Sequence, residues 1–156
     1  MANLMELLSF GDSGWGDELA HGVLVTVTLA LATLPLGLLI GFLIAVAKNS
    51  SEPLLRNAAH VYTTIFRGLP ELLTLFLIYY GGQMAMSALW RLLFGVPFEV
   101  NSYLAGMIAL ALMFSSYASE VFLSAFKGIT IGQYEGAYAL GLSRFRTMML
   151  IIVPQL

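Results

Sequence analysis

A few charged side chains lie inside long apolar stretches of this 156-residue sequence, and they are the residues that could do chemistry. Arg67 and Glu71 would share one helical face if the helix survives Pro70, and such a pair can neutralise itself in apolar surroundings. Glu120 lies towards one end of another apolar stretch. Because charges within membrane helices are functional candidates by default, we predict that Arg67, Pro70, Glu71 and Glu120 line a polar path between helices. The alternatives are that Arg67 only marks a membrane boundary and that Glu120 only reaches the membrane rim.

The sequence does not support a catalytic or metal-binding protein. The GDSG stretch at residues 11–14 is similar to the nucleophile turn of serine proteases, but neither His21 nor His60 has the sequence context of its base. The chain has no cysteine, and two histidines far apart do not make a metal site. No glycine-rich loop ending in Gly-Lys-Ser/Thr is present, so the chain is not itself an ATPase. We therefore predict no catalytic residue, no metal and no cofactor of its own.

The composition indicates a membrane protein. Hydrophobic residues make up 59% of the chain and charged residues 10%, whereas a soluble domain has about 25% charged residues. A net charge of -2 without a run of Lys or Arg excludes nucleic acid as a partner. The predicted fold class is all-α, a polytopic bundle of transmembrane helices embedded in a lipid bilayer.

The apolar runs predict about three complete spans and the start of a fourth. The uncharged run from Gly22 to Ala47 would be about 39 Å long as a helix, enough to cross a hydrocarbon core of about 30 Å. The other predicted elements are a polar connection at Lys48–Asn57, a second span at Ala58–Ala85 with a kink at Pro70, an interfacial segment at Met86–Asn101, a third span at Tyr103–Phe126 and a fourth beginning at Phe145.

Small residues recur every fourth position in the first span, at Gly37, Gly41 and Ala45. Such a stripe lets a second helix approach closely, although small residues are also common in spans generally.

The positive charges predict the orientation, because an excess of Lys and Arg marks the cytoplasmic side. Residues 1–21 have none, whereas residues 127–146 contain Lys127, Arg144 and Arg146. We therefore expect the N-terminus outside and residues 127–146 in the cytoplasm.

A short helix is predicted from Gly132 to Leu140, ended by Gly141, since glycine tolerates the left-handed conformation that often closes a helix. Little bulk at Gly136 and Ala137, with the carboxylate of Glu135 beside them, would suit a helix that docks into a groove of another protein. An ordinary connector between spans is the alternative interpretation.

The stretch EGAYALGLSRFRTMMLIIVP, residues 135–154, resembles the E-A-A-x3-G-x9-I-x-L-P signature of binding-protein-dependent ABC permeases. Glu135, Ala137, Gly141, Ile151 and Pro154 stand at the required spacings, while Gly136 and Val153 depart from the pattern. FRGLP at residues 66–70 and YASEVF at residues 117–122 are similar to stretches of the polar amino acid permeases. The pair Pro70 and Glu71, together with WGDEL at residues 15–19, is similar to the branch for basic amino acids and opines.

This resemblance implies the permease subunit of an ATP-driven importer in the bacterial inner membrane. Residues 1–21 would be a periplasmic tail, and residues 22–156 a permease domain that is incomplete, because family members continue beyond the proline of the signature. The implied partners are a second permease subunit, an ATP-binding subunit that hydrolyses ATP, and a periplasmic binding protein. Glu135, Gly136, Ala137 and Gly141 would couple the chain to the ATPase. A truncated remnant or membrane scaffold that does not transport is the alternative.

Overall fold

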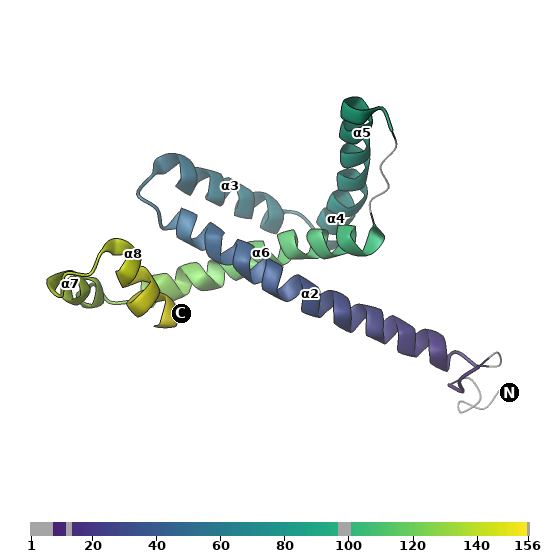
Figure 1. The fold of residues 1–156 in the computed structure, drawn as a ribbon, viewed down its shortest axis with the longest axis horizontal. Coiled ribbons are helices and arrows are strands. Elements are labelled where there is room, and N and C mark those ends of the chain that lie inside the picture. Colours follow the sequence, from purple (N-terminus) through teal and green to yellow (C-terminus); the bar gives the residue numbers. More distant parts are fainter. Residues whose placement is uncertain (1–7, 12–13, 97–100, 156) are drawn as a thin grey trace.

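A computed structural model describes residues 8–11, 14–96 and 101–155, and the secondary-structure elements in these residues are all helices (Figure 1). The GDSG segment and the predicted interfacial segment both extend outside the described residues. The helices are α2 (Gly16–Lys48), α3 (Pro53–Gly68), α4 (Glu71–Phe76), α5 (Gly82–Phe94), α6 (Ser102–Gly128), α7 (Ile131–Ala139) and α8 (Arg144–Thr147). A π-helical turn, Leu77–Gly81, joins α4 to α5, and further helical turns, Met148–Ile152 and Val153–Gln155, follow α8.

Helices α2 and α6 run in the same direction and cross near their middles (Figure 1). The small residues Gly37, Gly41 and Ala45 are buried. A Cβ atom added to Gly41 would lie 2.8 Å from the Ala118 Cβ and 3.0 Å from the carbonyl oxygen of Ser115. Because part of this obstruction is backbone, no side chain fits at Gly41 without separating the two helices. The predicted small-residue stripe is therefore the contact surface for α6.

The second span lies further along the chain than the sequence suggested. The described residues contain three helical segments long and apolar enough to cross a membrane, and they are α2, Glu71–Phe94 and α6. The number of complete spans is as predicted, but the boundaries Ala58–Ala85 are wrong. Residues 86–94, which we assigned to an interfacial segment, continue the candidate span in α5. The helix continues through Gly81 and Gly82, with a π-helical turn at Leu77–Gly81.

The polar connection after the first span is also shorter than predicted. Helix α3 begins at Pro53, so only residues 49–52 separate it from α2. Proline suits the first position of a helix, where its missing N–H would be unpaired in any case. The helix ends at Gly68, just before Pro70, which lacks the N–H that would continue it. The expected interruption at Pro70 is confirmed, and it separates α3 from α4.

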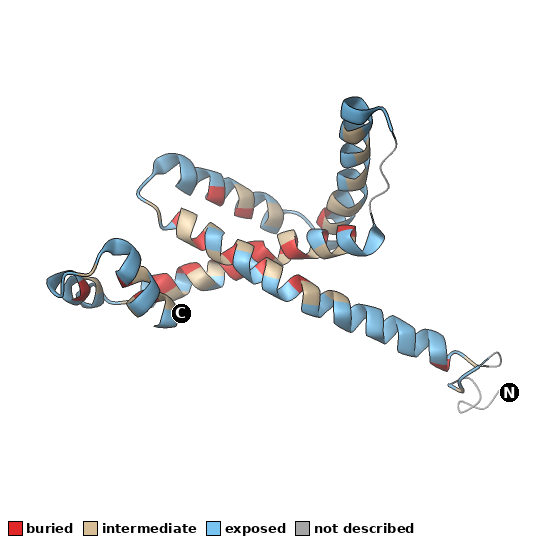
Figure 2. Cartoon of the chain, viewed as in Figure 1, coloured by how far each residue is buried: buried red, intermediate tan, exposed pale blue. Residues whose placement is uncertain are grey.

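A cluster of buried apolar residues joins the C-terminal ends of α2 and α6. This anchor cluster consists of Ala45, Leu123, Phe126 and Ile152. It brings the turn after α8 against both long helices, and Tyr134 of α7 packs on it. Figure 2 shows buried residues concentrated along the α2/α6 crossing, while the N-terminal part of α2 and most of α5 are exposed. Helices α7 and α8 are thus attached to the spans by packing as well as by the chain.

Helix α7 ends in a left-handed turn at Gly141, as its sequence predicts. Gly141 has a φ of +77°. Its N–H donates to the Tyr138 carbonyl at 2.9 Å, and the N–H of Leu142 donates to the Ala137 carbonyl at 3.0 Å. These two hydrogen bonds form a Schellman motif, which satisfies the last carbonyls of the helix and reverses the chain. The reversal directs the chain back from α7 to α8.

Candidate functional site

Three charged side chains from three helices meet beside the α2/α6 crossing. The Lys48 Nζ lies 2.5 Å from the Glu120 Oε1, and the Arg67 Nη1 lies 3.1 Å from the same oxygen. The side chain of Lys48 is 1% exposed and that of Glu120 34%, while that of Arg67 is 46% exposed. We call Lys48, Arg67 and Glu120 the charge cluster. It ties the last residues of α2 and α3 to the middle turns of α6.

Tyr117 extends the charge cluster to Glu71. The Tyr117 hydroxyl donates a hydrogen bond to the Glu71 Oε1 at 2.9 Å, and the guanidinium carbon of Arg67 lies 5.8 Å from the centre of the Tyr117 ring. The expected direct pairing of Arg67 with Glu71 is therefore wrong, because the break at Pro70 places the two residues on different helices. Arg67 pairs with Glu120 instead, and Tyr117 connects Arg67 to Glu71.

The predicted path residues are nevertheless neighbours in space. Arg67, Glu71 and Glu120 surround Tyr117, and Pro70 precedes Glu71 at the start of α4. Sequence reasoning missed Lys48, which it assigned to the polar connection, and gave no role to the hydroxyl of Tyr117. A local spacing could not reveal the Lys48–Glu120 pair, because 72 positions separate the two residues.

The charges of this site balance. Two cations, Lys48 and Arg67, face two carboxylates, Glu120 and Glu71, which suits surroundings of low dielectric constant. Lys48 is the most deeply buried of the four, so its charge depends on Glu120. Arg67 and Glu71 remain exposed enough to meet a ligand that carries charges of both signs. Among the described residues no group of His, Asp or Glu could hold a metal ion.

Helix α3 is held against α6 by a hydrogen-bonded tyrosine. The Tyr62 hydroxyl donates to the Leu112 carbonyl at 2.8 Å and lies 2.8 Å from the Ser115 hydroxyl. Burial raises the pKa of Tyr62 above its usual value, and the hydrogen bond with Ser115 acts in the opposite direction. The Tyr62 ring also packs on Phe66, with ring centres 4.4 Å apart. Tyr62 thereby positions the end of α3 from which Arg67 reaches Glu120.

The second group of predicted site residues lies on α7. Glu135 and Gly136 are exposed, and Gly141 forms the left-handed turn described above. Ala137 is 1% exposed, so the expectation that it forms part of an outward surface is wrong. Its small side chain faces the inside of the loop, on the side that packs against the rest of the chain. The outward surface instead includes Leu140, which is 80% exposed.

Residues 33–156 match the family described as binding-protein-dependent transport system inner membrane component. Among curated relatives, the chain is 36% identical over 153 residues to the nopaline transport system permease protein NocQ of Agrobacterium fabrum. It is 33% identical over 141 residues to the histidine/lysine/arginine/ornithine transport system permease protein HisQ of Salmonella typhimurium. These alignments cover 97% and 90% of this chain, but 65% and 62% of the two relatives.

A solved structure is similar as well. The chain resembles a protein from the crystal structure of an amino acid ABC transporter with histidines, at a TM-score of 0.61 and 28% sequence identity. The likeness covers 94% of this chain and 65% of that one. The chain thus spans less than two thirds of the length of the relatives reported above.

The charge cluster makes a prediction about stability. Replacing Glu120 by Gln leaves the charge of Lys48 buried without a counter-ion, and we expect a loss of about 3 kcal/mol. The double variant Lys48→Met with Glu120→Gln removes both charges and should regain most of that loss. Thermal unfolding of the purified protein in detergent measures both effects, and Glu71→Gln at an exposed carboxylate is the matched control. A double variant less stable than Glu120→Gln alone would contradict the dependence of Lys48 on Glu120.

Proposed function

Because the chain belongs to the family of binding-protein-dependent transport system inner membrane components, we propose that it is the permease subunit of an ATP-driven importer in the bacterial inner membrane. Members of this family are membrane components, so hydrolysis of ATP belongs to a separate subunit. The observation that carries the proposal is the signature loop on α7, which is packed onto the spans through the anchor cluster. An exposed helix held in this way can transmit a push from a partner to the membrane segments.

The substrate that we propose is a polar or basic amino acid or an opine. Similar permeases are named for the transport of nopaline, octopine or glutamine, or of histidine, lysine, arginine and ornithine. All of these compounds carry an amino or guanidino group as well as a carboxylate. Arg67 and Glu71 offer one charge of each sign beside the α2/α6 crossing. We propose that Arg67, Pro70, Glu71 and Glu120 line the translocation path.

Coupling to ATP hydrolysis would occur at α7. In this proposal Glu135 and Gly136 contact the ATP-binding subunit, and Gly141 shapes the turn that presents them. Ala137 acts from the inside, by allowing the loop to pack closely. The remaining partners are a second permease subunit, identical or paralogous, and a periplasmic binding protein. The N-terminus would lie in the periplasm and residues 127–146 in the cytoplasm, in accordance with the distribution of positive charge.

Reversing the charge at Glu135 tests the coupling role. In proteoliposomes that contain the complete transporter, Glu135→Lys should lower both uptake and binding-protein-stimulated ATP hydrolysis by about tenfold, because it removes a central interface contact. The matched control is Glu52→Lys, a second exposed carboxylate in the connection between α2 and α3. Membrane insertion should be unaffected in both variants. Wild-type uptake by Glu135→Lys would count against docking at α7.

Removing Arg67 tests the proposed path. Arg67→Ala should reduce uptake while subunit assembly and basal ATP hydrolysis stay at wild-type levels, because Arg67 is half exposed and its loss leaves the Lys48–Glu120 pair in place. Arg56→Ala, which removes an exposed arginine from the same helix, is the control. Uptake is followed with a labelled amino acid delivered by the binding protein. Equal uptake by the two variants would contradict the proposed path and would indicate that Arg67 only marks a membrane boundary.

A further inference from the structure

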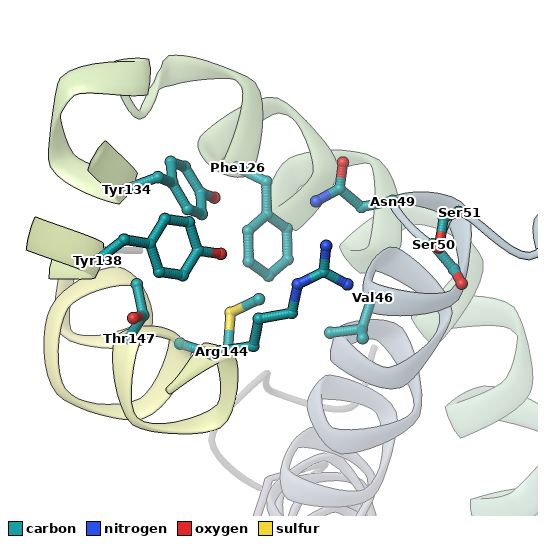
Figure 3. Close-up of a pocket in the computed structure, with 10 residues that line it drawn as sticks. Val46, Asn49, Ser50, Ser51, Phe126, Tyr134, Tyr138, Arg144 and Thr147 are labelled. Carbon is teal, nitrogen blue, oxygen red and sulfur yellow. The ribbon is translucent and has the colours of Figure 1, made fainter. Parts of the chain in front are cut away.

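A cavity of about 390 Å³ lies where the end of α2 meets α6, α7 and α8 (Figure 3). Its volume is within the range of small-molecule binding sites, which is about 300–1,000 Å³. The cavity is separate from the charge cluster, since none of Lys48, Arg67 and Glu120 lines it. It therefore needs an explanation other than the translocation path.

Arg144 supplies the charge of this cavity. Its guanidinium group extends into the cavity towards Asn49 (Figure 3). No Asp or Glu is among the lining residues, and the ion pairs of the described residues join Glu120 to Lys48 and to Arg67. Arg144 thus has no carboxylate partner within the part of the chain that the structure describes. A guanidinium group in this position is suited to an anion that enters the cavity.

Neutral hydrogen-bonding groups line the same cavity as Arg144. The hydroxyls of Ser50, Ser51 and Tyr138 line the cavity together with the amide of Asn49. Thr147 also lines it, and its hydroxyl is buried without a hydrogen-bond partner among the described residues. A buried hydroxyl of this kind is unfavourable unless a ligand or water bonds to it. A guanidinium group with hydroxyl groups in the same cavity suits the several acceptor oxygens of a phosphate.

The remaining walls of the cavity are apolar. Val46, Phe126 and Met148 line it. Val46 lies in the last turn of one candidate membrane span, and Phe126 lies close to the end of another. The cavity is therefore at the membrane boundary, polar on one side and apolar on the other. An amphiphile fits such a place better than a soluble ion, because basic pockets between spans at the membrane surface bind anionic headgroups.

We propose that this cavity binds the phosphate group of an anionic phospholipid. Arg144 and the hydroxyl of Tyr138 hold the phosphate oxygens, while Phe126 and Met148 contact the glycerol and the first part of the acyl chains. A lipid bound there touches α2, α6, α7 and α8 together. It would reinforce the attachment of α7 to the spans at the same end of the molecule as the anchor cluster.

Lipid binding to the purified complete gene product in detergent tests this proposal. Native mass spectrometry is used to titrate the protein with phosphatidylglycerol, with phosphatidylcholine and with inorganic phosphate. We expect one site that prefers phosphatidylglycerol, and we expect Arg144→Gln to weaken it about tenfold, because the charge-assisted bond to the phosphate is lost. Arg146→Gln is the matched control, since it removes the same charge from the same helix at an exposed residue that does not line the cavity.

The possible results separate the alternatives. Loss of the preference in Arg144→Gln but not in Arg146→Gln supports the site, and a smaller loss in Tyr138→Phe, which removes a single hydroxyl, supports it independently of the arginine. Equal loss in both arginine variants would show only general attraction between charges and would overturn the proposal. Displacement of the lipid by micromolar inorganic phosphate would also overturn it, because the cavity would then take the free ion. Circular dichroism checks that each variant is folded.

Discussion

The structure depends on the close approach of α2 to α6. Gly41 faces the Ala118 side chain and the Ser115 backbone, and any larger residue would separate the helices. In a lipid bilayer, helices associate through packing and hydrogen bonds rather than through the hydrophobic effect, so this contact must be tight to hold. The contact continues at Ala45, which is fully buried in the anchor cluster. The two long helices therefore form one crossed pair, and α3, α4 and the turn after α8 pack against it.

Two different groups of side chains lie at this crossed pair. The charge cluster lies beside it, where the buried amine of Lys48 at the end of α2 reaches Glu120 of α6. The anchor cluster lies at the C-terminal ends of the two helices, where Phe126 and Ile152 hold α7 and α8 in place. We therefore expect a displacement of α7 to be passed on to α2 and α6 and to the charges beside them. This packing would join the proposed coupling surface to the proposed path.

The sequence predicted the features that depend on local rules. The stripe at Gly37 and Gly41 could be proposed from its four-residue spacing, and the left-handed turn at Gly141 from the tolerance of glycine for a positive φ. Features that depend on the fold escaped prediction: Lys48 was assigned to a solvated connection because its partner is distant in the chain. Ala137 was assigned to the surface from its small bulk, but a small side chain suits a close internal contact as well as an outward face.

The central claim is that α7 moves with the crossed pair as one rigid body. The chain has no cysteine, so spin labels can be placed at Leu43→Cys on α2 and Ala139→Cys on α7, which are both exposed. Double electron–electron resonance would measure the distance between them in the complete transporter, first without nucleotide and then with ATP trapped in the ATP-binding subunits. We expect the distance between the labels on α2 and α7 to be the same in both states. The distance from Ala139→Cys of this chain to the equivalent position in the second permease subunit should change. A change of several ångströms between the labels on α2 and α7 would contradict the account.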